Sequence, residues 1–326
     1  MRCAYTLNGM HGLGDNLHER AIVRELMRGH DLWLKTSWPQ LFWDLPELHL
    51  VPLKSPIPWM AKNEIRTAAL YGRTAAPPGS KVVSNGYLSR MRPGNRVSVL
   101  QTMADVCGVP LGAGDFRLPI APAWNAKADA VLMELADDRP LMIYRPLIAL
   151  HGQNRESARA KLARNPDCEA YHALASRIRQ QFFVISVADL VDGVESIIES
   201  ESQIEPDAVY HKGELDLETM AALTARAELV FTSPCFMTVL AQAVSAPLIC
   251  IFGGFEGKES FSAGARYSPW LPIEPISPCA CWSPACNHDK TIDIPLAHAR
   301  IAEFIVEHHN GNSAHPEKAL DAVARG

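Results

Sequence analysis

The chain has 326 residues, of which 48% are hydrophobic, and its formal net charge at pH 7 is −5. This length exceeds one ordinary domain and suits two domains of about 150 residues each. The mildly negative charge provides no global basic field for nucleic acid. The chain contains no run of about 18 apolar residues, which is the length that a membrane-spanning helix needs.

The cysteines and the first residues bear on the compartment. Eight cysteines in a chain of this length do not form a disulfide scaffold. The apolar run at the start is too short and too quickly polar for a signal peptide. We therefore expect a cytoplasmic protein without a transmembrane segment, and peripheral association with a membrane stays open.

The first half alternates short apolar runs with helical patterns, which predicts a parallel sheet covered by helices. Strands are expected at Cys3–Leu7, Asp31–Lys35, Leu48–Leu53 and Lys81–Ser84, and helices at Asn16–Arg28 and Ser98–Cys107. Proline-rich punctuation at Pro110, Pro119 and Pro122 then indicates a linker that ends near Trp124-Asn125. We place an N-terminal Rossmann-like domain at residues 1–125.

The same alternation restarts in residues 126–326. Strands are expected at Leu141–Tyr144, Phe182–Val187, Leu229–Thr232 and Pro247–Phe252, and helices at Cys168–Arg179, Leu217–Ala227, Phe236–Val244 and Ala297–His308. The polar stretch Glu195–Glu205 looks like a solvated connection. The predicted fold class is α/β, with two Rossmann-like, doubly wound parallel-sheet domains facing a central cleft. Ligands of such sheets bind beyond the carboxyl ends of the strands.

A glycine-rich turn follows the first expected strand and reads Gly12-Leu13-Gly14-Asp15. Such a turn lets a ligand approach the backbone and aims a helix N-terminus at it. A dinucleotide-binding turn more usually reads G-x-G-x-x-G, without a carboxylate where phosphates approach. Asp15 therefore indicates a general base facing a cleft. The alternative is that Asp15 only caps the following helix.

Near the C-terminus the chain reads C-x-C-x4-C-x-H, with Cys279, Cys281, Cys286 and His288. Three thiols and an imidazole can form a tetrahedral structural zinc site. Four protein ligands leave no open position, so the spacing does not suggest a catalytic metal. A set of reduced thiols, or one disulfide, is the alternative.

Four short segments, in this order, resemble glycosyltransferase family 9, which has the GT-B fold and includes the lipopolysaccharide heptosyltransferases. They are Gly12–His18, Cys107–Pro110, Gly213–Leu223 and Pro247–Gly253. Each is weak alone, and the match rests on their order and spacing. The chain would be a divergent member.

The resemblance implies an inverting, hexosyl- or heptosyl-type transfer of a sugar from a nucleotide-diphosphate donor to an acceptor hydroxyl, without a catalytic metal. Asp15 would be the general base. Arg145, which follows an expected strand, would clamp the diphosphate through its paired donors. The other residues expected to bind the nucleotide sugar are Gly14, Asn16, Ser233, Cys235, Gly253 and Gly254.

The chain departs from the family at one turn. Heptosyltransferases carry Asp-Thr-Gly followed by a helical His, whereas this chain has Pro234-Cys235-Phe236 and then Val239. The donor base and sugar therefore stay open.

The acceptor and the reaction keep alternatives as well. The resemblance implies a saccharide or glycolipid acceptor. A modified base in DNA is an alternative acceptor, for which Arg155, Arg159, Lys161 and Arg164 form a short basic stripe at helical spacing. A nucleotide-sugar epimerase and a non-catalytic nucleotide-binding protein are the rival functions.

Overall fold

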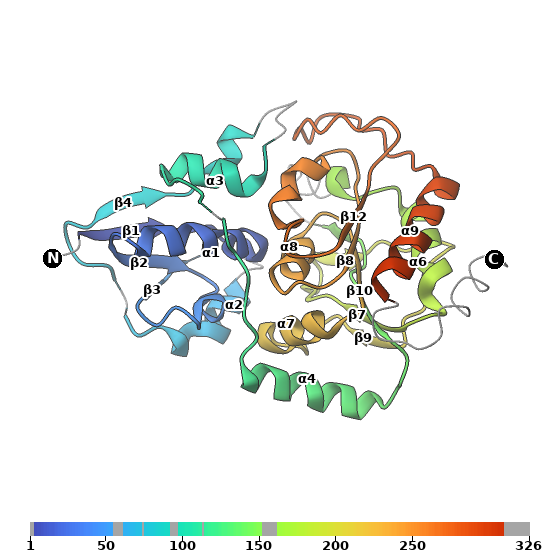
Figure 1. The fold of residues 1–326 in the computed structure, drawn as a ribbon, viewed down its shortest axis with the longest axis horizontal. Helices are drawn as coiled ribbons and strands as arrows, with labels where there is room; N and C mark the ends of the chain where they lie inside the picture. Colours follow the sequence, from blue (N-terminus) through green and yellow to red (C-terminus); the bar gives the residue numbers. More distant parts are fainter. Residues whose placement is uncertain are drawn as a thin grey trace. The chain divides into compact units, whose positions relative to one another are not determined.

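The computed structural model describes residues 3–54, 61–73, 75–91, 97–112, 114–151 and 162–309. Within these ranges the chain forms two compact units. The first runs to Pro119 and also includes Glu259–Gly264, and the second comprises Ile120–Lys258 and the chain from Ala265 onward. Figure 1 shows the elements of both.

The first unit is built on a four-stranded parallel sheet in the order β3-β2-β1-β4. The strands are β1 (Ala4–Asn8), β2 (Asp31–Thr36), β3 (His49–Pro52) and β4 (Lys81–Ser84). The helices are α1 (Leu13–Met27), α2 (Ala61–Thr67) and α3 (Val99–Cys107), with 3-10 turns η1 (Pro39–Phe42), η3 (Ala68–Leu70) and η4 (Tyr87–Arg90). Strand β1 is central and pairs with β2 and β4, so the turn that follows it lies at the middle of the sheet edge.

Helix α1 begins three residues earlier than the sequence pattern predicts. Gly12 is its N-cap, in an extended conformation and without a side-chain cap. Asp15 consequently lies inside the first turn of the helix, and the interpretation of Asp15 as the N-cap is wrong. Because a helix dipole attracts negative charge in the first turn, this position is suited to a carboxylate.

The second unit contains a six-stranded parallel sheet in the order β12-β11-β10-β5-β7-β9, and a two-stranded antiparallel pair β6-β8. The strands are β5 (Leu141–Tyr144), β6 (Ile148–Leu150), β7 (Phe183–Val187), β8 (Glu195–Ile197), β9 (Ala208–Tyr210), β10 (Leu229–Thr232), β11 (Leu248–Ile251) and β12 (Trp270–Ile273). Every residue of β5, β7, β10 and β11 is buried. Strands covered on both faces read as continuous apolar runs, which is why these four are visible in the sequence.

Helices cover the second sheet. They are α4 (Pro122–Leu135), α6 (Cys168–Arg179), α7 (Leu217–Arg226), α8 (Phe236–Ala243) and α9 (Ile294–His309). The 3-10 turn η5 (Lys258–Gly264) belongs, from Glu259 onward, to the first unit. Helices α6 and α9 pack together and share one apolar core with the central strands. Helices α7 and α8 contact β5, β10 and β11, and α4 packs on α7. The α/β class with parallel sheets, expected from the sequence, is confirmed.

Two local predictions are wrong. The expected linker around Pro122 and Trp124 is the start of α4, because proline fits the first turn of a helix, where its missing N–H is not needed. The expected polar connection Glu195–Glu205 begins with β8, which pairs with β6. In the described part of the chain, no helix is long and apolar enough to cross a bilayer.

Candidate functional site

The turn after β1 is fixed by buried polar contacts. Asn16 is fully buried, and its amide donates to the carbonyls of Met10 (2.7 Å) and Gly12 (2.8 Å) while its oxygen accepts from the Thr36 hydroxyl (2.6 Å). These bonds use the side chain within the protein, so Asn16 shapes the turn. Gly14 is the second residue of α1.

Asp15 is held by a tyrosine from a distant part of the first unit. The Tyr87 hydroxyl donates to Asp15 Oδ1 at 2.8 Å. Gly12 makes room for the carboxylate, because a Cβ at position 12 would lie 2.6 Å from Asp15 Oδ2. A carboxylate oriented by a second group is an arrangement that suits general-base chemistry.

Arg145 lies at the carboxyl end of β5 in the second unit. Its Nη1 donates to the Val187 carbonyl at the end of β7 (2.8 Å), and its guanidinium lies 5.0 Å from the centre of the Phe236 ring. The Arg145 carbonyl accepts from the Tyr171 hydroxyl at 2.5 Å. These contacts hold a guanidinium at the edge of the sheet where ligands of parallel α/β folds bind.

His211, which we did not predict, lies at the same edge. It follows the short strand β9, and its Nε2 is 2.8 Å from the Ser186 hydroxyl at the end of β7. Burial, together with the charge of Arg145, lowers the pKa of His211. A neutral imidazole beside a guanidinium offers a polar contact to a ligand at this edge. Strand β9 has only three residues, which is too short to give a periodic signal.

The turn between β10 and α8 contains Ser233 and Cys235. Cys235 is the N-cap of α8 and makes no side-chain cap hydrogen bond. Its Sγ lies 3.3 Å from the Thr232 hydroxyl, and the buried Ser233 carbonyl accepts from the Thr238 hydroxyl. Backbone N–H groups at a helix start attract anions, so this turn is suited to a phosphate. Val239 is buried within α8.

Gly253 and Gly254, which follow β11, are required by close packing. A Cβ at Gly253 would lie 2.3 Å from the Asn165 carbonyl oxygen, and Gly254 has a φ of +85°. The Gly254 carbonyl accepts from the Ala280 N–H, and the Phe255 carbonyl accepts from the Trp282 N–H. The turn is therefore bonded directly to the segment that carries the cysteines.

The four predicted metal ligands lie together. Their ligand atoms are all within 4.8 Å of one another, with Cys279 Sγ 3.0 Å from His288 Nδ1 and 3.8 Å from Cys286 Sγ. Zinc–sulfur bonds of about 2.3 Å at the tetrahedral angle separate two thiolates by about 3.8 Å. His288 Nε2 donates to the Ser283 carbonyl (3.0 Å), which turns Nδ1 toward the thiols as an outer-shell partner of a metal ligand does.

The loop around these ligands has two non-glycine residues with positive φ, Ala280 (45°) and Trp282 (56°), on either side of Cys281. None of the eight cysteines forms a disulfide, so the disulfide interpretation of this cluster has no support. The donor set and its spacing fit a tetrahedral metal ion. We call Cys279, Cys281, Cys286 and His288 the Cys/His cluster.

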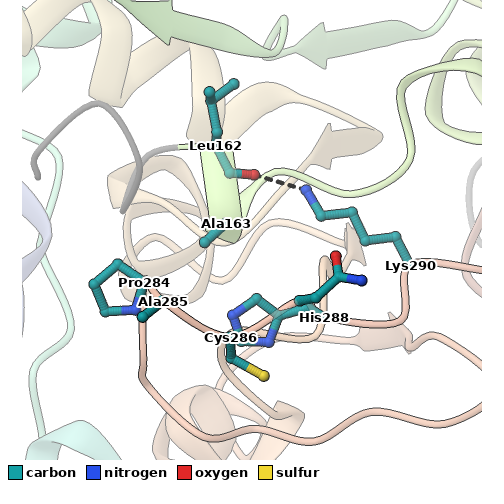
Figure 2. Close-up of a pocket in the computed structure, with 8 residues that line it drawn as sticks. Leu162, Ala163, Pro284, Ala285, Cys286, His288 and Lys290 are labelled. Atoms are coloured by element: carbon teal, nitrogen blue, oxygen red, sulfur yellow. Dashed lines mark hydrogen bonds between the residues drawn. The ribbon is translucent and has the colours of Figure 1, made fainter. Parts of the chain in front are cut away.

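A cavity of about 600 Å³ adjoins the Cys/His cluster. Figure 2 shows Cys286 and His288 on its wall and Lys290 reaching toward Leu162. Lys290 Nζ donates to the Leu162 carbonyl at 2.7 Å, and burial lowers the pKa of Lys290. The cluster therefore shapes one wall of this cavity.

The chain is similar to known proteins in structure and not in sequence. No protein-family profile and no curated protein matches the chain. A family 9 glycosyl transferase from Veillonella parvula DSM 2008 superposes with a TM-score of 0.61 at 11% identity, over 94% of this chain and 98% of that one. The iron-containing dodecameric glycosyltransferase TibC from enterotoxigenic E. coli H10407 gives 0.57 at 15%, over 96% and 77%.

A third solved structure, the ADP-heptose lipopolysaccharide heptosyltransferase II of E. coli, gives a TM-score of 0.53 at 13% identity, over 95% of this chain and 100% of that chain. At these identities the likeness defines the fold. The chain has the GT-B fold, in the form found in family 9 glycosyltransferases, as the sequence resemblance implied.

Proposed function

We propose that the protein is an inverting glycosyltransferase that moves a sugar from a nucleotide-diphosphate donor to an acceptor hydroxyl. The observation that carries the proposal is the Asp15 carboxylate, held by Tyr87 at 2.8 Å in the first turn of α1, in a fold shared with solved glycosyltransferases.

In the proposed reaction, Asp15 takes the proton of the acceptor hydroxyl while that oxygen attacks the anomeric carbon. The bond from this carbon to the diphosphate breaks, and its electron pair leaves with the diphosphate. Attack opposite to the leaving group inverts the anomeric configuration. The protein groups named here supply both the base and the leaving-group contacts, without a catalytic metal.

The second unit is proposed to bind the donor at the carboxyl edge of its sheet. Arg145 would pair with the diphosphate, since a guanidinium offers paired donors to phosphate oxygens. The start of α8 at Ser233 and Cys235 would add backbone N–H groups. A structure of TibC is described in complex with ADP-D-beta-D-heptose, so ADP-heptose is the first donor to test.

We also propose that the Cys/His cluster holds one structural metal ion. The Cys3His donor set favours zinc. Thiolate ligands also bind iron, and the similar TibC is described as iron-containing. The ion would cross-link the loop at 279–288, and no catalytic step depends on it.

The test compares Asp15→Asn with the wild-type protein over a panel of ADP-, UDP- and GDP-sugars. Thermal shift reports donor binding, because a ligand at 100 times its dissociation constant stabilises a fold by about 2.7 kcal/mol. Asp15→Asn should retain donor binding and lose sugar transfer by about 10²-fold or more. Asp105→Asn, which removes an exposed carboxylate of α3, is the matched control. Transfer at the wild-type rate by Asp15→Asn would refute the mechanism.

The alternatives give different outcomes in the same assay. A nucleotide-sugar epimerase converts the donor with no acceptor present, and a non-catalytic protein binds the donor without turnover. For a DNA acceptor, three residues of the basic stripe, Arg155, Arg159 and Lys161, lie outside the described residues. The fourth, Arg164, forms an ion pair with Glu256 at 2.5 Å, so its charge is compensated within the protein and gives the DNA alternative no support.

A further inference from the structure

Helix α1 carries a second carboxyl group one turn beyond Asp15. Glu19 is fully buried and, at a spacing of four residues, lies on the same face of the helix. A buried acid is costly unless it is neutral or fully bonded. The hydrogen bonds of the Glu19 carboxyl group therefore indicate its structural role.

The Glu19 carboxyl joins two segments of the first unit. Its Oε1 accepts from the Met10 backbone N–H and from the Asn85 side-chain amide, both at 2.9 Å. Its Oε2 lies against Gly9, where a Cβ would be 2.8 Å away. Glu19 thus fastens the turn after β1 to the segment that follows β4.

That segment reaches both carboxyl groups. Asn85 donates its backbone N–H to the Asn8 carbonyl and its side-chain amide to Glu19. Two residues later, Tyr87 donates to Asp15. One short stretch of chain, Asn85-Gly86-Tyr87, therefore bonds to an Asp-x3-Glu pair on one helix.

We infer that Glu19, Asn85 and Tyr87 are positioning residues for Asp15. The hydrogen bonds of Glu19 and Asn85 fix the turn after β1 to the segment after β4, and Tyr87, on that segment, orients the Asp15 carboxylate. This inference rests on the proposed function. The two acids, one helical turn apart, then have different roles: Glu19 is buried and anchors the turn, and Asp15 is oriented for proton transfer.

The charges support this division. Burial, reinforced by the negative charge of Asp15, raises the pKa of Glu19 to about 8, although the bonds from Asn85 and Met10 oppose the rise. On α3, burial and the charge of Glu19 raise the pKa of Cys107 to about 12. With a pKa of about 8, Glu19 is mainly protonated at pH 7, so it does not place a full negative charge one helical turn from Asp15.

The test is a carboxyl-carbon NMR titration of the full chain, which needs no substrate. In Tyr87→Phe the pKa of Asp15 should rise by about one unit, because a hydrogen bond that favours the charged form is lost. Tyr71→Phe is the control: Tyr71 is a tyrosine of the same unit whose hydroxyl donates to the Thr36 carbonyl (2.6 Å), and its loss should leave the Asp15 titration unchanged. An unchanged Asp15 titration in Tyr87→Phe would overturn the inference.

Transfer kinetics then separate positioning from simple structural support. Glu19→Gln is neutral and retains an acceptor for Met10 and Asn85, so it should keep kcat at pH 7 within about threefold, whereas Glu19→Ala should lower kcat by about 10-fold or more with unchanged donor affinity. Equal kcat values in Glu19→Ala and wild type would contradict the inference. Because Asp15→Asn is assayed in parallel, activity in that variant would instead show that the proposed base is wrong.

Discussion

Tyr87 and Asp15 are 72 residues apart in the sequence, and the tyrosine hydroxyl lies 2.8 Å from the carboxylate. The contact joins the segment after β4 to the first turn of α1, so the orientation of Asp15 depends on sheet pairing between β1 and β4. The proposed base is therefore set by tertiary structure, and changes in the glycines around it should alter transfer.

Gly12→Ala tests the space around the proposed base. A Cβ at this position would lie 2.6 Å from Asp15 Oδ2, which forces the carboxylate to shift. A shift of about 1 Å in a reacting group can cost about 10²-fold in rate. Steady-state kinetics should show reduced kcat with little change in donor affinity. Gly29→Ala, at a glycine with open space around it, should keep the wild-type rate. Equal kcat values for the two variants would contradict the prediction.

Arg145→Ala should weaken donor binding. Charge-assisted hydrogen bonds contribute about 1.5–3 kcal/mol each, which corresponds to about a 10- to 100-fold rise in the donor dissociation constant. Calorimetry with ADP and with AMP would show whether the loss depends on the β-phosphate. Arg139→Ala is the control, because Arg139 pairs with Asp137 and Asp207. An unchanged dissociation constant in Arg145→Ala would remove Arg145 from the donor site.

The sequence predicts this fold well where burial is continuous and poorly where it is not. Strands such as β7 and β11 are buried at every residue and are evident as apolar runs. Strand β9 has three residues, of which Val209 is exposed, so neither it nor His211 beside it was predicted. The sequence pattern does not predict helix α4, because Pro122 is typical of a linker as well as of the first turn of a helix.

The candidate site divides in a similar way. Asp15 and the Cys/His cluster each lie within a single sequence motif, from which a general base and a metal site can be predicted. Tyr87 has no motif, and its role follows only from the long-range contact with Asp15. Glu19 has no signal in the sequence, because an acid on a helix is ordinarily solvated, whereas this one is buried against Gly9 in the turn after β1.

Glu19 should make the free energy of unfolding depend on pH. Its pKa is about 8 in the folded protein against 4.5 for an ordinary glutamate, so the folded state binds the proton more tightly. This contribution is fully present below pH 4.5 and is lost as pH rises through about 8. Urea unfolding of wild type and Glu19→Gln should show the stability difference shifting toward the variant by about 3–5 kcal/mol between pH 5 and pH 9.

The control for this pH dependence is Asp105→Asn, which makes the same change in charge at an exposed position of α3. Its stability difference from wild type should vary far less over the same range. Parallel pH curves for Glu19→Gln and wild type would show that Glu19 does not hold a proton in the folded protein at neutral pH.

Removal of the metal should loosen the turn after β11 as well as the cysteine loop. The two are joined by the bonds from Ala280 to Gly254 and from Trp282 to Phe255, and the Phe255 ring packs edge-on against His288. Elemental analysis should find about one zinc or iron per chain, and chelation should lower the melting temperature by about 10 °C. Cys286→Ser should reproduce this fall, whereas Cys3→Ser, at an exposed thiol, should not. Because Gly253 and Gly254 are expected donor contacts, chelation should also weaken ADP binding. If the melting temperature and the ADP affinity were both unchanged after complete loss of the metal, the Cys/His cluster would have no structural role.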